Sequence, residues 1–203
     1  MPHVLAIAGG SASGKSTLAQ EVVRTLGDAA QHLLHDRYYL APPDGVDPNG
    51  WNFDHPDSLD TARMVQHLAE LRAGRPVDVP RYDFTVHAPE PALERLEARP
   101  VVIVEGILVL TDPALRALAD MTVFVDAPAD IRLARRLRRD VAERGRAPMQ
   151  VLDRYLAMVR PMHQEWVEPC RDHADLVVDG TRPIEALLAE VLAVMQARGL
   201  SIR

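Results

Sequence analysis

The segment Gly9–Ser16 carries the strongest chemical signal in this sequence of 203 residues. It matches the spacing G-x-x-x-x-G-K-[ST] of a phosphate-binding loop. Such a loop turns backbone N–H groups toward phosphate oxygens, its lysine contacts the β- and γ-phosphates, and its hydroxyl binds Mg²⁺. The pattern therefore predicts binding of a magnesium–nucleoside triphosphate by residues Gly9, Gly10, Ser11, Ala12, Ser13, Gly14, Lys15, Ser16 and Thr17.

Lys15 is the only lysine in the chain, which otherwise contains 22 arginines. The single ammonium group stands where a compact point charge is needed rather than a planar fork. A chance match to the loop pattern becomes less plausible for this reason. The lysine count also argues against a GTPase, since the Asn-Lys-x-Asp motif of that family needs a second lysine.

Three acids follow predicted strands, namely Asp36, Glu105 and Asp126. Ligands of open α/β sheets bind beyond the carboxyl ends of the strands, so these acids are candidates for chemistry. Glu105 resembles an acid that helps to hold Mg²⁺, and Asp36 could accept the proton of an attacking hydroxyl. We expect Asp126 to cap or orient the following helix.

Seven arginines lie within fifteen residues, and Arg132, Arg136 and Arg139 share one helical face. By itself the cluster would indicate a solvated helix with Asp130, Asp140 and Glu143 as partners. Together with a phosphate loop, it instead predicts a lid over residues 129–160 that brings positive charge to the transferred phosphoryl group.

Hydrophobic periodicity predicts alternating strands and helices, and therefore a parallel α/β sheet flanked by helices in a single domain, 1–203. The residues of 36–57 predict a long functional loop, and Ser58 is expected to cap the next helix. Strands are expected at 4–8, 30–35, 77–87, 101–104, 123–125 and 176–178. Helices are expected at 15–26, 58–72, 129–143, 149–168 with an interruption at Pro161, and 184–196.

Composition narrows the class of protein. The net charge of −6 argues against nonspecific nucleic-acid binding, which needs a basic surface. The longest apolar run, 101–110, contains Glu105 and is too short to span a bilayer. Cys170 is the only cysteine and is expected in the core. A reducing, cytoplasmic location is expected.

Nearly the whole chain resembles the uridine/cytidine kinase family of P-loop kinases. The resemblance covers the phosphate loop, HDRYY at 35–39, NFDHPD at 52–57, PRYDF at 80–84 with His87, EGIL at 105–108, the arginine cluster, VRPMH at 159–163 and Ala174-Asp175. It implies a P-loop NTPase fold with a substrate segment at about 36–98 that contains a small β-hairpin, and a helical lid.

The resemblance also implies roles for individual residues. Asp36 would be the general base, while Lys15, Arg136 and Arg139 would act on the phosphates. Ser16 and Glu105 would hold Mg²⁺. The nucleoside would be bound by Tyr39, Asp54, Tyr82, His87, Arg136, Arg146 and Arg154.

The implied activity is transfer of the ATP γ-phosphoryl group to the 5′-hydroxyl of uridine or cytidine in pyrimidine salvage, by a homotetramer. A phosphoribulose or pantothenate kinase and a non-enzymatic nucleotide-binding regulator are the alternatives. Two positions depart from the family pattern. Pro89 stands where the family usually has arginine, and Arg154 stands where it usually has glutamine.

Overall fold

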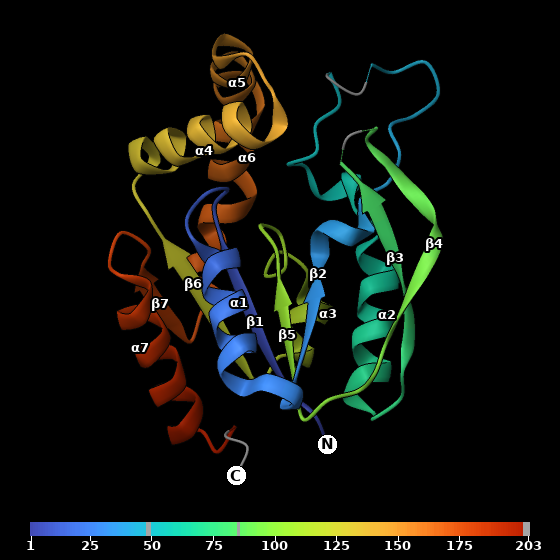
Figure 1. The fold of residues 1–203 in the computed structure, drawn as a ribbon, viewed down its shortest axis with the longest axis vertical. Helices are drawn as coiled ribbons and strands as arrows, with labels where there is room; N and C mark the ends of the chain where they lie inside the picture. Colours follow the sequence, from blue (N-terminus) through green and yellow to red (C-terminus); the bar gives the residue numbers. More distant parts are fainter. Residues whose placement is uncertain (48–49, 85, 201–203) are drawn as a thin grey trace.

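The computed structural model describes residues 1–47, 50–84 and 86–200 (Figure 1). The parts of the predicted loop and strand at 48–49 and 85 lie outside these residues, as does 201–203 of the predicted domain. The central sheet has five parallel strands in the order β2-β5-β1-β6-β7. The strands are β1 His3–Gly9, β2 Ala30–Leu34, β5 Val101–Glu105, β6 Met121–Asp126 and β7 Leu176–Asp179. The predicted parallel α/β sheet is confirmed.

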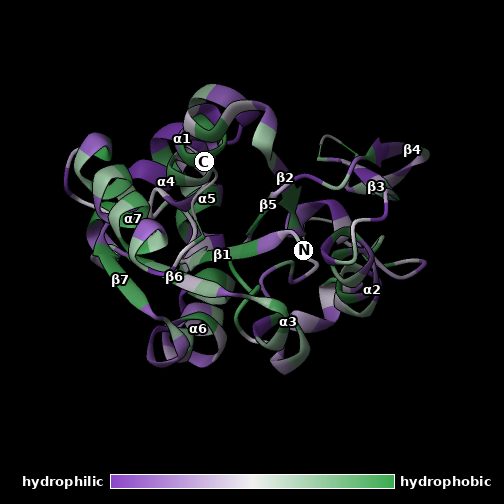
Figure 2. Ribbon diagram, turned by 90° about the horizontal axis from the view of Figure 1, so that it is seen from below, coloured by the Kyte–Doolittle hydropathy of each residue, from purple (hydrophilic) through white to green (hydrophobic). Residues whose placement is uncertain are grey.

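Side chains of β1 alternate between two hydrophobic cores, because successive residues of a strand point to opposite faces of the sheet. Leu5 and Ile7 pack beneath α1 Lys15–Leu26 and α7 Ile184–Ala197. Val4, Ala6 and Ala8 face the other core, which contains α2 Thr61–Arg72, α3 Pro113–Leu118 and the buried Cys170. Helices therefore cover both faces of the sheet (Figure 2).

Two further segments flank the sheet: a helical pair beyond the C-terminal ends of its strands, and a hairpin that runs beside α2 (Figure 1). One is the helical pair α4 Ala129–Arg144 and α5 Pro148–Arg154. The other is an antiparallel hairpin of β3 Val77–Asp83 and β4 Ala88–Leu96, with an irregular register between Pro80 and Tyr82.

The predicted interruption at Pro161 is wrong, because the backbone stays helical from α5 through that residue. Pro161 lies in α6 Arg160–Met162, between the π-helical turns Tyr155–Val159 and His163–Val167. Proline lacks an N–H and crowds the carbonyl four residues earlier, so a regular α-helix would break or kink there. The wider π-turns accommodate it. A 3-10 segment, Glu168–His173, follows.

The predicted capping role of Ser58 is also wrong. Asp60 caps α2, since its carboxylate accepts a hydrogen bond from the Arg63 backbone N–H at 3.1 Å. Ser58 lies in the 3-10 turn Pro56–Ser58 and is fully buried, and its hydroxyl donates to the carbonyl of His55 at 2.6 Å. Ser58 therefore holds the end of the predicted functional loop, 36–57, in place. In the described ranges, no helix is long and apolar enough to cross a membrane.

Candidate active site

The phosphate loop joins β1 to α1 in the backbone conformation that its glycines allow. A Cβ on Gly9 would lie 2.5 Å from the carbonyl oxygen of Val125, so no larger residue fits there without a shift. Gly14 has a φ of 106° and precedes α1, whose start has no side-chain cap. The first backbone N–H groups of α1 therefore point toward the loop, as an anion site requires.

Lys15, Ser16 and Glu105 meet at the end of β5. The Lys15 Nζ lies 3.3 Å from Glu105 Oε1, and the Ser16 hydroxyl donates to the same oxygen at 3.0 Å. Lys15 and Glu105 are both buried. The hydroxyl and carboxylate oxygens are hard ligands that fit Mg²⁺, which usually takes one or two protein ligands and completes its shell with phosphates and water. Within the described ranges, no cluster of three His, Cys, Asp or Glu side chains offers a fuller metal site.

A cavity of about 180 Å³ extends from the phosphate loop toward the hairpin. It brings together residues that the sequence separates by up to about 140 positions. All seven predicted nucleoside-contacting residues line it, together with Asp36, Lys15, Ser16 and Arg139. Four lining residues were not predicted at all, namely Phe53, Phe84, Ile107 and Arg144. Ser11 was predicted to bind ATP but also lines this cavity.

Two acids lie in this cavity. Burial raises the pKa of Asp36 to about 6, with a further contribution from the negative charge of Glu105, although Lys15 opposes the shift. Burial also raises the pKa of Asp54, against the positive charges of Arg136 and Arg154. Asp36 lies two residues after β2, in the 3-10 turn His35–Tyr38, and shares the cavity with Lys15 and Ser16 of the phosphate loop. It is poised to accept a proton near neutral pH.

Aromatic rings form the wall of the cavity away from the phosphates. The ring of His87 stacks on Phe53 at a centroid distance of 5.0 Å and an interplanar angle of 23°. Tyr39 packs against Tyr82 at 5.5 Å. The Tyr82 hydroxyl is buried and has no hydrogen-bond partner among the described residues, so a ligand atom could supply one.

His87 has a φ of 55°, in the left-handed region. Burial lowers its pKa, and the neighbouring Arg146 and Arg154 charges lower it further. The imidazole is therefore neutral at pH 7 and can donate from one nitrogen and accept at the other.

The arginine cluster is organised around Asp140, which is fully buried. Its carboxylate lies within 2.9 to 3.6 Å of the guanidinium groups of Arg136, Arg139, Arg144 and Arg146. Burial opposes ionisation of Asp140, but these arginines outweigh it and lower its pKa. The alternative of a merely solvated helix is wrong, because four cations share one buried anion and leave a net positive charge facing the cavity.

Arg136 and Arg154 extend this cationic wall. Arg136 donates from Nη1 to the Ser11 hydroxyl of the phosphate loop at 3.0 Å. Arg154 donates to the carbonyl of Trp51 at 2.8 Å and lies 5.7 Å from the centroid of Phe53. The helical pair α4 and α5 thus contacts both the phosphate loop and the predicted functional loop, 36–57.

A second cavity, of about 410 Å³, opens on the other side of the phosphate loop, where Ala12, Gly14 and Thr17 line it. Arg135 and Arg182 lie opposite them, and Arg135 donates to the carbonyl of Gly180 at 2.9 Å. This cavity can accommodate the part of a nucleotide beyond its phosphates. The sequence analysis missed it, although the position of Gly180 and Arg182 just after β7 was an available signal.

Asp126 does not cap α4, contrary to the sequence-based expectation. The helix begins after Pro128 with no side-chain cap, and the Asp126 carboxylate instead pairs with Arg171 at 3.4 Å. Arg132 also differs from its neighbours on the helical face, because it lines a separate cavity and not the one that holds Asp36.

Comparison with known proteins agrees with this geometry. Residues 4–185 match the Phosphoribulokinase / Uridine kinase family. A uridine kinase from Chloroflexus aurantiacus is 45% identical, with 97% of each chain covered. One from Streptococcus thermophilus is 38% identical, with 96% of each covered. The phosphoribulokinase from Rhodobacter spheroides shares the fold, with a TM-score of 0.63 and 14% identity over 90% of this chain and 74% of its own. The chain therefore belongs to the phosphoribulokinase/uridine kinase family of ATP-dependent kinases.

Proposed function

We propose that this kinase transfers the γ-phosphoryl group of ATP to the 5′-hydroxyl of uridine or cytidine, giving UMP or CMP. The observation that carries the proposal is the shape of one cavity. It places an acid with a raised pKa beside the phosphate loop and an aromatic wall with an unpartnered tyrosine hydroxyl at the other end. A ribose with a planar base matches that order of groups. The relatives named uridine kinase, up to 45% identical over nearly the full chain, support the same acceptor.

In the proposed reaction, Asp36 accepts the proton of the 5′-hydroxyl as its oxygen attacks the γ-phosphorus. The bond from that phosphorus to the β,γ-bridging oxygen breaks, and ADP leaves. Lys15, Arg136 and Arg139 stabilise the negative charge on the phosphoryl oxygens. Ser16 and Glu105 would hold Mg²⁺, which when bound supplies charge neutralisation across the β- and γ-phosphates.

The nucleoside would lie between the hairpin and the helical segment. Asp54 is positioned to accept hydrogen bonds from ribose hydroxyls. Phe53, Tyr82 and His87 would surround the base, and the neutral imidazole can bond either the carbonyl of uracil or the amino group of cytosine. Residues 36–98 would act as the substrate segment and 129–160 as the lid of a single kinase domain.

The wider biological context is part of the proposal. Uridine and cytidine phosphorylation would serve pyrimidine salvage in the cytoplasm. We propose a homotetramer that acts on small molecules and not on nucleic acid, on the basis of the family resemblance and the net charge of −6.

The test is ADP release with Mg-ATP and a panel of acceptors. We expect turnover with uridine and cytidine and none above background with ribulose 5-phosphate or pantothenate. Turnover with either of the latter would assign the chain to another branch of the family. ATP binding without turnover on any acceptor would favour a regulatory protein.

A further inference from the structure

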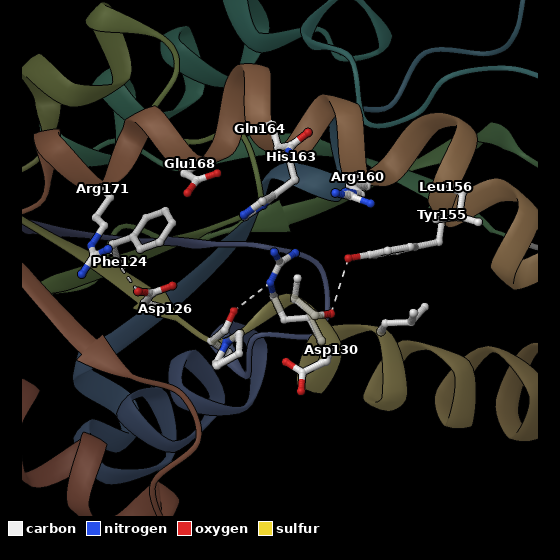
Figure 3. Close-up of a pocket in the computed structure, with 15 residues that line it drawn as sticks. Phe124, Asp126, Asp130, Tyr155, Leu156, Arg160, His163, Gln164, Glu168 and Arg171 are labelled. Carbon is white, nitrogen blue, oxygen red and sulfur yellow. Dashed lines mark hydrogen bonds and ion pairs between the residues drawn. The ribbon is translucent and has the colours of Figure 1, made fainter.

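A cavity of about 490 Å³ that has no part in the proposed reaction lies beside the phosphate loop. One wall is the end of β6 and the start of α4, with Asp126 and Asp130, and the other is the helical segment 155–171. Figure 3 shows Tyr155, His163 and Glu168 reaching from this segment toward the opposite wall. None of its lining residues lines either of the two cavities of the active site. Its volume lies within the range of small-molecule sites.

Arg132 is the most buried charge in this cavity, at 6% exposed. Its Nε donates to the carbonyl of Ala127 at 2.9 Å. In the described part of the chain, no carboxylate lies within ion-pair distance of its guanidinium. A buried cation without a counter-ion is costly, so an anion that entered the cavity would be stabilised there.

Two further groups converge on the same space. His163 has a buried Nδ1 with no hydrogen-bond partner among the described residues. Arg160 is exposed at the rim and, within the same residues, forms no ion pair. Arg171, by contrast, is matched by Asp126 at 3.4 Å. Arg132 and Arg160 therefore face the cavity without a direct ion pair, and the more distant charges of Asp126 and Glu168 do not outweigh the burial that lowers the pKa of Arg132.

The side chains that line the cavity indicate which chemical groups a ligand would carry. The guanidinium groups of Arg132 and Arg160 can both donate hydrogen bonds to a phosphomonoester, which carries a charge of about −1.5 to −2 at pH 7. The carboxylates of Asp130 and Glu168 also line the cavity and would accept hydrogen bonds from hydroxyl or amino groups. The cavity is larger than a phosphate alone, so the ligand would have a polar body of several atoms.

The cavity contacts the phosphate loop directly. A Cβ on Gly10 would lie 2.8 Å from Arg132 Nη1 and 3.0 Å from His163 Cε1, so both side chains pack against this residue. A ligand that moved either side chain would change the space available to the second residue of the loop. Occupancy of the cavity can thereby influence ATP binding on the far side of the loop.

We propose that this cavity is a regulatory site for a small phosphomonoester that carries hydroxyl or amino groups. Its phosphate contacts Arg132, Arg160 and His163, and its body contacts Glu168 and Asp130. Binding there alters the affinity of the phosphate loop for ATP through the contacts with Gly10.

The test is calorimetric titration of the full chain with three probes, namely sn-glycerol 3-phosphate, ribose 5-phosphate and O-phosphoserine. The protein is first saturated with Mg²⁺ and a non-hydrolysable ATP analogue, so that the phosphate loop is occupied. We expect at least one probe to bind and glycerol, which lacks the phosphate, not to bind. Binding of none of the probes, with or without the ATP analogue, would overturn the proposal.

Variants locate the binding. Arg132→Gln is expected to weaken probe binding at least tenfold, and the rim variant Arg160→Gln at least threefold. Arg138→Gln, an exposed arginine of the same helix outside the cavity, is the matched control and should leave the Kd unchanged. Arg160→Gln keeps the test decisive if Arg132→Gln does not fold. An unchanged Kd in Arg160→Gln, or in a folded Arg132→Gln, would place the probe elsewhere.

The coupling to the loop has a separate readout. The Kd of the ATP analogue is measured with and without saturating probe, and we expect a change of at least threefold that is lost in Arg160→Gln. An identical Kd in both conditions would refute the regulatory role. Neither measurement depends on which acceptor the kinase uses.

Discussion

Lys15 and Glu105 form a buried ion pair, with Nζ and Oε1 3.3 Å apart, and Ser16 donates to the same carboxylate oxygen. The phosphate-loop lysine is thus held by an internal partner before any nucleotide binds. Nucleotide with Mg²⁺ would replace this pairing, because phosphate oxygens offer Lys15 a new anion and the cation offers Glu105 a new charge. The pair keeps both side chains in place for that exchange.

Glu105→Gln tests the proposed role of this carboxylate. The amide loses the negative charge that would attract Mg²⁺, so we expect kcat/KM to fall at least about 100-fold and the Mg²⁺ concentration for half-maximal rate to rise. Turnover measured across a Mg²⁺ series checks both effects. Glu97→Gln, at an exposed acid after β4, should behave as the wild type. An unchanged Mg²⁺ requirement in Glu105→Gln would remove Glu105 from the metal site.

Asp36→Asn tests the proposed general base. We expect kcat to fall about 100- to 10,000-fold while the Kd for ATP changes little, because the amide cannot accept the proton. Asp44→Asn, in the same loop and exposed, is the control. Near-normal turnover of Asp36→Asn would contradict the assignment.

The pH profile follows from the same carboxyl group. Burial and the charge of Glu105 raise the pKa of Asp36 to about 6, so its basic form is present above that pH and is lost as the pH falls. We expect kcat/KM for the nucleoside to be level above the pKa and to fall about tenfold per pH unit below it. Initial rates between pH 4.5 and 8 at saturating ATP measure this. A profile that stays flat down to pH 4.5 would show that no group of raised pKa limits the reaction.

Asp140→Asn tests whether one buried anion organises the arginine cluster. Without its charge, four guanidinium groups repel one another, and we expect the free energy of unfolding to fall by about 3 kcal/mol. This value is at the low end of the range for removing one partner of a buried ion pair, because the side chains of Arg139, Arg144 and Arg146 are partly exposed and solvent screens their charges. A fall in Tm of about 6–12 °C follows for a chain of this length. Differential scanning calorimetry measures it, with Asp172→Asn, at an exposed acid, as the control. A fall in Tm of less than about 2 °C would mean that the arginine cluster does not depend on the charge of Asp140.

Arg154→Gln tests base preference at the departure from the family pattern. Guanidinium groups only donate hydrogen bonds, whereas an amide donates and accepts. Carbonyl-rich uracil suits a donor, so we expect the substitution to lower the uridine-to-cytidine ratio of kcat/KM about threefold or more. Steady-state rates with both nucleosides give the ratio, and Arg138→Gln should leave it unchanged. An unaltered ratio would show that Arg154 does not discriminate between the bases.

Sequence reasoning located β1 and α1 closely, since a buried strand, a glycine-rich loop and a helix stop at Gly27 are all local signals. The hairpin that the family resemblance implied is confirmed, but hydrophobic periodicity did not locate β4, because Ala88–Leu96 contains two prolines and several charges, and only pairing with β3 makes it a strand. Sequence reasoning expected a break at Pro161 because the rule is local, while the π-turns that accommodate proline depend on packing.

In the active site, too, residues with local sequence signals were predicted, and those that depend on tertiary structure were not. Residues within recognisable motifs, such as Asp54 and His87, were predicted and line one cavity. Arg182 was missed although it follows a predicted strand, because the cavity that it lines with Ala12 forms only when β7 pairs with β6. Asp140 was expected as one solvated partner of the arginines, but its burial and its sharing by four of them were missed, since burial of a charged side chain is a tertiary property.

The uncapped start of α1 gives the nucleotide a structural role in addition to its chemical one. Asp60 and Asp112 close the first turns of α2 and α3, whereas α1, like α4 and α7, has no side-chain cap, and its first turn faces the site of the phosphates. ATP then completes a helix of the enzyme while it serves as a reactant. The backbone amides of Lys15, Ser16 and Thr17 should exchange with solvent deuterium readily in the free protein and slowly when nucleotide is bound.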